Sequence, residues 1–331
     1  MAESTKAQPS KRWRRLRMAL MMLGIIAVLL IFVVVPFAFS YLLTHARSRP
    51  MDSEITPHAV AGLPIQDIDF LSADGVKLSG WYLSREAAPA TIIYCHGLFR
   101  SRLEMLDRAT RFWQLGYAGL LFDFRRHGKS EGELSSMGYL ERQDVIGAVR
   151  YVIDRLHFAH PVVVHGVSMG AAAALLAAAE EPAIAGLIVD SSFLSFDQTI
   201  AHHAKLWLGL PKFPLADEIS LFTKWRVGFN SEEFDLRRAV QKIGDRPILF
   251  IAGGADKRMP PEIAQQLFEA SPSTNKHILI IPDAPHGAAF RTDPETYEKA
   301  LLNCLHTVCE NWKKQDKLST AALENDFPLA H

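Results

Sequence analysis

The sequence predicts an α/β fold in which a mostly parallel sheet is covered by helices on both faces. Three observations predict this fold. Short, continuous apolar runs alternate with helix-patterned segments from about residue 90 to residue 312, as is typical of parallel strands buried on both faces. The apolar runs lead into turns that carry glycine, histidine or aspartate. One run, at residues 162–164, passes through Gly-x-Ser-x-Gly directly into an alanine-rich segment.

The first half of the predicted domain begins with a hairpin. Residues 65–70 and 76–83 alternate around the turn signal Ala73-Asp74-Gly75, which is the pattern of a β-hairpin. We then expect strands at 90–95, 117–122, 162–164 and 184–189, with helices at 102–115, at 139–156 and from 171 onward.

The second half contains an insertion before the sheet resumes. Residues 193–240 are rich in aromatic side chains and are interrupted by Pro211 and Pro214. We interpret them as a short, mainly helical lid over the end of the sheet. Strands at 247–252 and 276–281, a helix at 260–270 and a helix from 294 to about 312 then complete a domain over residues 65–312, followed by a tail at 313–331.

The N-terminal part has the composition of a membrane anchor. Residues 18–43 are almost wholly apolar and uncharged, and about 20 apolar residues suffice to span a bilayer. Five basic residues at 11–17 precede this run, whereas only Arg47 and Arg49 follow it. The positive-inside rule therefore predicts a cytoplasmic segment at 1–17, a single transmembrane signal anchor at 18–43, a linker at 44–64 and a non-cytoplasmic catalytic domain. In a bacterium this would be a protein of the inner membrane.

A cleaved signal peptide is the alternative interpretation of the same run. The segment Ala38-Phe39-Ser40 resembles a small-residue cleavage site. The apolar run is longer than the roughly 7–15 residues of a signal-peptide core, which favours an uncleaved anchor.

Charge and cysteine content narrow the class of function. The formal net charge of the 331 residues is zero, which gives no support for a nucleic-acid partner. The three cysteines, Cys95, Cys304 and Cys309, do not form a metal-binding pattern. We see no phosphate loop or nucleotide fingerprint, so we expect neither a cofactor nor a metal.

The Gly-x-Ser-x-Gly segment predicts a nucleophilic serine at Ser168. Placed between a strand and a helix, this pattern forms a sharp turn that exposes the serine oxygen. Gly166 and Gly170 lack Cβ atoms, which lets strand and helix pass closely. The alternative is a glycine-rich turn whose serine only caps the helix.

A serine nucleophile needs a base, and the base needs an acid to orient it. In this kind of sheet the chain order is serine, acid, histidine, each on a loop after a strand. Asp256 and His286 meet these conditions and are our predicted acid and base. Asp190 also follows a strand and is an alternative acid, although we expect it to hydrogen-bond within its own turn, and Asp283 lies too close to His286 in sequence.

Two backbone N–H groups should form the oxyanion hole. One is that of Met169, directly after the nucleophile, and the other should come from the loop after the strand ending at Cys95. That loop reads His96-Gly97-Leu98, and we predict the Leu98 N–H as the second donor. An ordinary glycine turn is the alternative interpretation of this loop.

Together these residues resemble the α/β-hydrolase superfamily over about residues 65–312. The loop at 123–130 resembles the family's Asp-x-Arg-Gly-x-Gly-x-Ser segment, with Arg126 where a glycine is usual. The resemblance implies structural roles for Asp123 and Arg125 of this loop. The whole chain is similar to membrane-anchored serine hydrolases, whose relatives are described as serine aminopeptidase-like or lysophospholipase-like.

The expected function is hydrolysis of a carboxylic ester or thioester through an acyl-enzyme. The aromatic lid favours an apolar or lipid-like acyl group, although these side chains could equally be present only to pack the lid. A small-molecule ester, thioester or lipid is therefore the expected partner, together with the membrane. A serine peptidase of aminopeptidase type and a catalytically silent, membrane-tethered binding protein are the alternatives.

Overall fold

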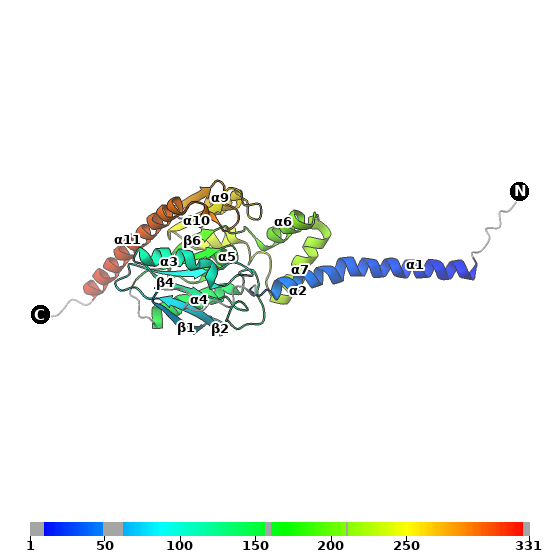
Figure 1. The fold of residues 1–331 in the computed structure, drawn as a ribbon, viewed down its shortest axis with the longest axis horizontal. Coiled ribbons are helices and arrows are strands. Elements are labelled where there is room, and N and C mark those ends of the chain that lie inside the picture. The colour runs from blue at the N-terminus through cyan, green and yellow to red at the C-terminus, as the bar shows by residue number, and fades with distance from the viewer. Residues whose placement is uncertain (1–9, 49–61, 156–159, 210, 327–331) are drawn as a thin grey trace.

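The computed structural model describes residues 10–48, 62–155, 160–209 and 211–326 (Figure 1). The first nine residues of the predicted cytoplasmic segment and most of the predicted linker, residues 49–61, lie outside the described residues.

The centre of the molecule is an eight-stranded sheet with the order β1-β2-β4-β3-β5-β6-β7-β8. The pairs β1–β2 and β2–β4 are antiparallel, and all other neighbouring strands are parallel. The mostly parallel sheet and its N-terminal hairpin are therefore confirmed. The strands are β1 Ile65–Leu71, β2 Lys77–Leu83, β3 Thr91–Cys95, β4 Ala118–Phe122, β5 Val162–Val167, β6 Ile184–Asp190, β7 Ile248–Gly253 and β8 Lys276–Ile281.

Helices cover both faces of this sheet (Figure 1). One buried cluster joins the sheet to α4 (Glu141–Arg150), α5 (Met169–Glu180), α8 (Leu236–Lys242) and α9 (Pro261–Ala270). The other cluster joins the opposite face to α3 (Leu106–Gln114), α10 (Ala289–Thr292) and α11 (Pro294–Asp326). A short η4 segment, Arg102–Met105, precedes α3, and η5, Tyr151–Arg155, continues α4.

The last helix differs from the prediction. We expected it to end near Trp312, but α11 continues to Asp326. Residues 313–326 contain neither glycine nor proline and are rich in lysine, alanine and leucine, which favour helix. Nothing in this stretch would therefore end the helix.

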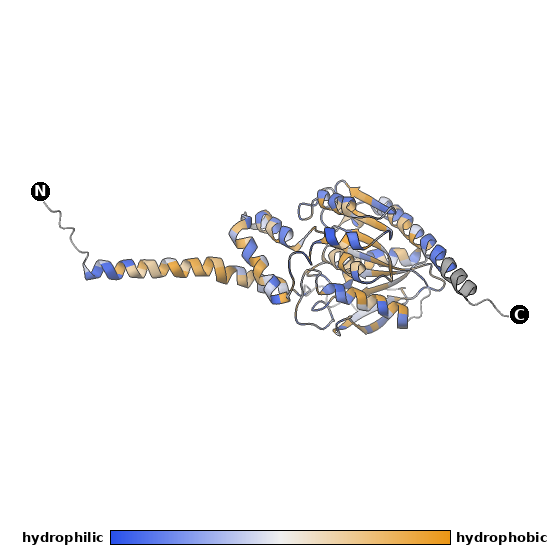
Figure 2. Ribbon diagram, turned by 180° about the vertical axis from the view of Figure 1, so that it is seen from behind, coloured by the Kyte–Doolittle hydropathy of each residue, from blue (hydrophilic) through white to orange (hydrophobic). Residues whose placement is uncertain are grey.

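The apolar N-terminal run forms one long helix over Lys11–Thr44, made of α1 (Lys11–Leu29), η1 (Leu30–Val34) and α2 (Val35–Thr44). It is long and apolar enough to cross a membrane. Its first part, α1, stands clear of the domain with its apolar surface exposed (Figure 2), whereas α2 packs on the domain end. The π-helical η1 segment ends at Val34, two residues before Pro36. Proline lacks an N–H and its ring crowds the preceding turn, so the helix widens locally there rather than ending.

The lid consists of α6 (Phe196–Leu208), η6 (Lys212–Ala216) and α7 (Asp217–Val227). These elements lie at the end of the domain from which α2 emerges, and α7 runs beside α2 (Figure 1). The helical part of the lid is shorter than the predicted 193–240, because α8 packs on α5 and α9 instead. The apolar side chains of α8, Leu236, Ala239 and Val240, are buried there.

Candidate active site

Ser168 lies at the tip of the sharp turn between β5 and α5. Its backbone has φ 55° and ψ −115°, a conformation that non-glycine residues rarely adopt. A Cβ atom on Gly166 would lie 2.3 Å from the carbonyl carbon of Gly170. One on Gly170 would lie 2.2 Å from the carbonyl oxygen of Cys95. Both glycines are therefore required by the close packing around the turn.

His286 lies between Ser168 and Asp256 and contacts both. Its Nε2 is 3.0 Å from Ser168 Oγ, and its Nδ1 is 2.7 Å from Asp256 Oδ2. The other carboxylate oxygen of Asp256, Oδ1, accepts the N–H groups of Arg258 and Met259 at 2.8 and 2.9 Å. The loop after β7 therefore fixes the carboxylate, and the carboxylate fixes the imidazole with Nε2 toward the serine.

The loop after β3 lies against Ser168 on the other side. A Cβ built on Gly97 would be 3.6 Å from the Cβ of Ser168. The N–H of Gly97 donates to Glu104 Oε2 at 2.6 Å, and that of Phe99 donates to His127 Nε2 at 3.3 Å. The Leu98 N–H between them has no acceptor among the described residues. The Met169 N–H is the first of α5 and has no acceptor within its helix.

His96 holds this loop in place as a neutral ring. Its Nε2 accepts the Phe124 N–H at 3.0 Å, and its Nδ1 lies 2.8 Å from the Gly97 carbonyl oxygen. Burial, reinforced by the neighbouring His127, lowers the pKa of His96 to about 3. A neutral imidazole can accept at one nitrogen and donate at the other, which is what these two contacts require.

The loop at 123–130 is held by buried ion pairs. Asp123 accepts the Arg102 guanidinium at 2.6 Å, and Arg125 contacts Asp144 at 2.7 Å. Both pairs are made within the domain, as the structural roles implied by the resemblance require. Arg126, which stands where the family has a glycine, has a φ of 64°. The arginine thus adopts the left-handed conformation that normally favours glycine.

The side chain of Asp190, the alternative acid, contacts Ser191, Tyr297 and Arg108 rather than His286. Its Oδ1 accepts the Ser191 hydroxyl at 2.9 Å. Its Oδ2 accepts the Tyr297 hydroxyl at 3.1 Å and lies 3.5 Å from the Arg108 guanidinium. All of these side chains are buried. The exposed Asp283, the other alternative, lies on the surface.

The Asp190 cluster also holds the loop that carries the histidine. Arg108 donates to the Gly287 carbonyl oxygen at 2.9 Å, and the Gly287 N–H donates to Ser191 Oγ at 3.1 Å. The sequence analysis missed Arg108 and Tyr297, because both lie in helices that are distant in sequence from Asp190 and belong to no local motif. A single arginine in an amphipathic helix gives no signal that it will be buried.

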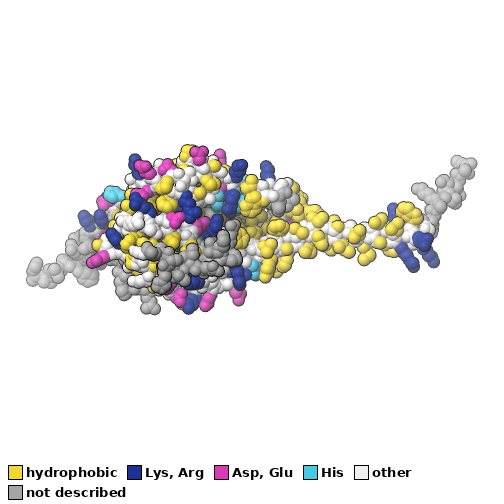
Figure 3. Space-filling view, viewed as in Figure 1, with side chains coloured by type: hydrophobic (Ala, Val, Ile, Leu, Met, Phe, Trp, Pro, Cys, Tyr) yellow, Lys and Arg dark blue, Asp and Glu magenta, His cyan; other side chains and the backbone are white. Residues whose placement is uncertain are grey.

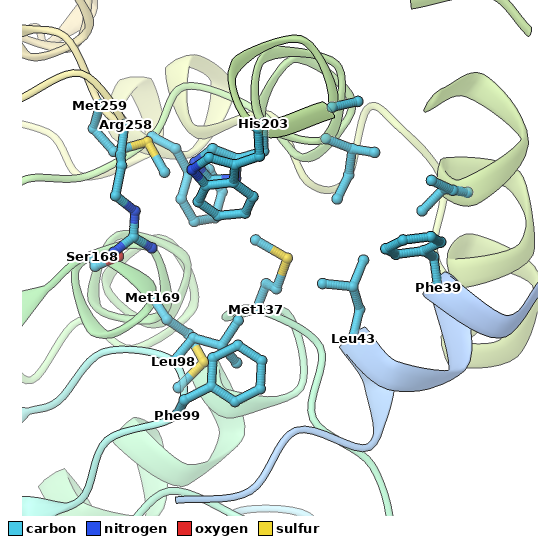
Figure 4. A pocket seen from close by; sticks show the side chains of 15 residues that line it. Phe39, Leu43, Leu98, Phe99, Met137, Ser168, Met169, His203, Arg258 and Met259 are labelled. Atoms are coloured by element: carbon cyan, nitrogen blue, oxygen red, sulfur yellow. The ribbon is translucent and has the colours of Figure 1, made fainter. Parts of the chain in front are cut away.

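An apolar cavity of about 140 Å³ opens on Ser168 (Figure 4). One water needs about 10–15 Å³ of such volume, so the cavity has room for several waters or for part of an apolar chain. From the domain it is lined by Leu98, Met137 and Met169, and from the lid by Ile200, His203, Trp207 and Ile219. Phe39 and Leu43 of α2 also line it, which the sequence did not predict.

His203 is the lid residue with a titratable group in this cavity. Its ring stacks on Trp207 with centroids 4.4 Å apart. Burial and the nearby Arg258 charge lower the pKa of His203 to about 4. The His203 ring is therefore neutral near pH 7 and adds no charge to the cavity wall.

No group of three or more histidine, cysteine or acidic side chains that could hold a metal ion occurs in the described ranges. Cys95, Cys304 and Cys309 are buried and unpaired.

Known proteins are similar to this chain across most of the domain. A family model described as serine aminopeptidase, S33, matches residues 86–219. The uncharacterised protein YqkD of Bacillus subtilis is 30% identical over 239 residues, covering 72% of this chain and 78% of that protein. An uncharacterised membrane protein of Saccharomyces cerevisiae is 27% identical over 235 residues, covering 70% of this chain and 77% of that protein.

Solved structures are similar to this chain in fold. That of an esterase from Pyrococcus furiosus matches with a TM-score of 0.65 and 26% identity, covering 79% of this chain and 97% of that chain. The family match includes Ser168 but ends before Asp256 and His286, whereas the esterase match covers the greater part of the sheet. By its sheet, its relatives and its structural neighbours, the chain is a hydrolase that belongs to the α/β-hydrolase superfamily.

Proposed function

We propose that this hydrolase cleaves carboxylic esters or thioesters with an apolar acyl group, through an acyl-enzyme formed on Ser168. The observation that carries the proposal is the position of His286, whose two ring nitrogens contact Ser168 Oγ and Asp256 Oδ2 at 3.0 and 2.7 Å. These contacts have the lengths that proton transfer and ring orientation need.

In the first half of the reaction Ser168 Oγ attacks the carbonyl carbon while His286 Nε2 accepts the hydroxyl proton. The carbonyl oxygen becomes an oxyanion, which the N–H groups of Met169 and Leu98 are proposed to stabilise. The bond to the leaving group then breaks, and His286 returns the proton to the departing alcohol or thiol. Asp256 keeps the imidazole oriented and stabilises its charged form.

In the second half water replaces the leaving group. His286 removes a proton from the water, whose oxygen attacks the acyl carbon of the Ser168 ester. The tetrahedral intermediate collapses, the bond to Ser168 Oγ breaks, and His286 returns the proton to the serine. The products are a carboxylic acid and the free enzyme.

The cavity favours an ester over a peptide with a free amino terminus, although the family match bears the name of an aminopeptidase. An ammonium group would be recognised by a carboxylate. None of the described residues that line the cavity is acidic, and Arg258 brings a positive charge. An apolar acyl chain suits this lining better than a charged amine.

The long apolar helix is proposed to anchor the enzyme in a membrane. The five basic residues at 11–17 favour a cytoplasmic N-terminus, with the catalytic domain on the other side. Protease treatment of sealed vesicles tests this orientation. We expect the domain to be digested only from the non-cytoplasmic face, and digestion from the cytoplasmic face would reverse the proposed topology.

Hydrolysis assays with detergent-solubilised, full-length protein test the activity. We expect turnover of p-nitrophenyl esters, with a rate that depends on acyl chain length, and much slower turnover of aminoacyl anilides. Ser168→Ala should abolish the ester activity of a protein that is still folded. Full ester activity in that variant would refute the mechanism, and faster cleavage of the anilides would favour the peptidase.

A further inference from the structure

One side of the Ser168 cavity is lined by α2, the last part of the proposed membrane anchor. Ser168 and Phe39 lie at opposite ends of the cavity, with Met137 between them (Figure 4). Phe39 and Leu43 are one helical turn apart on α2, so their side chains share a face of that helix. This face of α2, made of Phe39 and Leu43, is called the anchor wall below.

A neighbouring face of α2 is fixed to the lid and the domain. Pro36, Ser40 and Thr44, spaced by four residues, are all buried. The Arg226 guanidinium of α7 donates to the hydroxyls of Ser40 and Thr44. The backbone carbonyl of Thr44 accepts the Ser135 N–H at 2.8 Å.

Aromatic contacts complete the junction between anchor and lid. The Arg226 guanidinium lies over the rings of Phe37 and Tyr41, at 4.8 and 5.6 Å from their centroids. Phe37 also packs edge-on against Phe222 of α7, with centroids 5.6 Å apart. Ring contacts and hydrogen bonds thus place the anchor wall at a defined position against the cavity.

Helix length places this wall near the surface of a bilayer. The uncharged run begins at Met18, and about 20 residues cross the hydrocarbon core, which ends the crossing near Phe37. At about 1.5 Å per residue, Leu43 lies about 9 Å further along the helix, in the headgroup layer. The cavity wall thus adjoins the boundary between lipid chains and headgroups.

The lid presents apolar side chains at the same level. Leu206, Trp207, Phe213, Leu221 and Trp225 are exposed although they are large and apolar. Apolar surface runs without a break from the anchor onto this part of the molecule (Figure 3). Tryptophan and other aromatic residues are enriched at membrane interfaces, so a lipid surface is the partner that this patch fits.

From these observations we infer that the anchor wall is part of the substrate-binding site, and that a long-chain ester dissolved in the bilayer reaches Ser168 past Phe39 and Leu43. The inference rests on the proposed function, because it assigns the acyl chain of the same reaction. The end of the acyl chain nearest the ester lies among Met169, Leu98 and Met137. The chain then extends to the anchor wall.

A photoreactive inhibitor tests this path in the wild-type protein, without any substitution. The full-length enzyme in phosphatidylcholine vesicles is treated with a hexadecyl fluorophosphonate that carries a diazirine at the end of its chain. The phosphonate bonds to Ser168, and light then inserts the chain end into its neighbours. We expect crosslinks in the peptide that contains residues 37–44. Crosslinks confined to the sheet-side lining would overturn the inference.

A small fluorophosphonate in a parallel sample separates the two ways of failing. If it labels Ser168 while the long probe misses α2, the inference fails and the proposed function stands. If it does not label Ser168, the proposed function fails and the inference fails with it.

A matched pair of variants gives an independent test. Leu43→Trp narrows the cavity at the anchor wall, whereas Leu42→Trp adds the same ring at a neighbouring position that is 64% exposed. We expect Leu43→Trp to lower the ratio of p-nitrophenyl palmitate to p-nitrophenyl acetate hydrolysis at least about tenfold. Leu42→Trp should leave this ratio unchanged. An unchanged ratio in both variants, or an equal fall in both, would contradict the inference.

Discussion

The two sides of the Ser168 cavity are built by different physical means. On the sheet side, Ser168, Asp256 and His286 lie on loops after parallel strands. Close packing at glycines, a buried ion pair and the hydrogen bond between His286 and Asp256 hold these loops in one arrangement. On the lid side, α2 and α7 meet through rings and one arginine, beside the exposed apolar side chains of the lid. The difference indicates that the proposed catalytic side chains are held in one arrangement, whereas the proposed substrate-facing wall is held by weaker contacts that depend on the surrounding medium.

After Ser168→Ala, the largest effect expected from a single substitution on the rigid side concerns the acid. Asp256→Asn removes the charge that stabilises the imidazolium, and should lower kcat about 10⁴-fold by analogy with other serine triads. Steady-state ester hydrolysis measures it. Asp283→Asn, an exposed residue three positions from His286, is the matched control and should retain full activity. A similar loss in both variants would contradict the assignment of Asp256.

Asp190→Asn should act mainly on stability. It leaves the Arg108 guanidinium buried without its charged partner, and breaking a buried ion pair costs about 3–5 kcal/mol. Denaturant unfolding of the solubilised protein measures the change. Activity should fall less than in Asp256→Asn, since Asp190 acts on His286 only through Ser191, Arg108 and Gly287. An unchanged stability with a 10⁴-fold loss of activity would make Asp190 the acid.

The pH dependence of stability tests the neutral state of His96. Its pKa is about 3 in the folded protein and about 6.5 in the unfolded chain. The unfolded state therefore binds more protons between these values, so the stability is fully present above pH 6.5 and is lost as the pH falls toward 3. From pH 7 to pH 5.5, His96 should lower the free energy of unfolding by about 1 kcal/mol.

Replacing this histidine isolates its share. Denaturant unfolding at the two pH values, in wild type and His96→Gln, should show a smaller acid-induced loss of stability in the variant. An equal loss in both proteins would mean that His96 is not held neutral in the folded state.

The smallest effect is expected on the lid side. Arg226→Gln removes the charge over Phe37 and Tyr41, which is worth about 0.5–1 kcal/mol per contact at partly exposed sites. Hydrogen exchange in α7 should accelerate about 5- to 30-fold for the two contacts together, while β7 in the sheet should be unaffected. Arg238→Gln, which breaks an exposed ion pair with Glu232, is the control and should leave α7 unchanged. Equal acceleration in α7 and β7 would mean that the lid and the sheet unfold together.

The sequence predicted the rigid side well and the other side poorly. The turn at Ser168 and the order of serine, acid and histidine along the chain are signals that can be read locally. Each consists of a short apolar run followed directly by a turn or loop with a distinctive residue. The predicted residues Ser168, Asp256 and His286 do lie together, at the distances given above, and their roles stay predictions.

The other side depends on contacts between distant segments. On the lid side, Arg226 meets Ser40 across 186 positions. The sheet side has one such contact as well, because Arg108 meets Gly287 across 179 positions. Neither arginine belongs to a periodic pattern or a motif, and Phe39, within an apolar run, gives no signal beyond that of a lipid-facing residue. The sequence therefore predicted a membrane anchor and a lid but not that they share a wall of the cavity.

The most direct test of the central claim is fluorophosphonate labelling of the full-length protein, with the modified residue located by mass spectrometry. The account predicts one adduct on Ser168, lost in Ser168→Ala and strongly slowed in Asp256→Asn. An adduct on another residue, or no adduct on a folded wild-type protein, would contradict the proposal that Ser168 is an activated nucleophile.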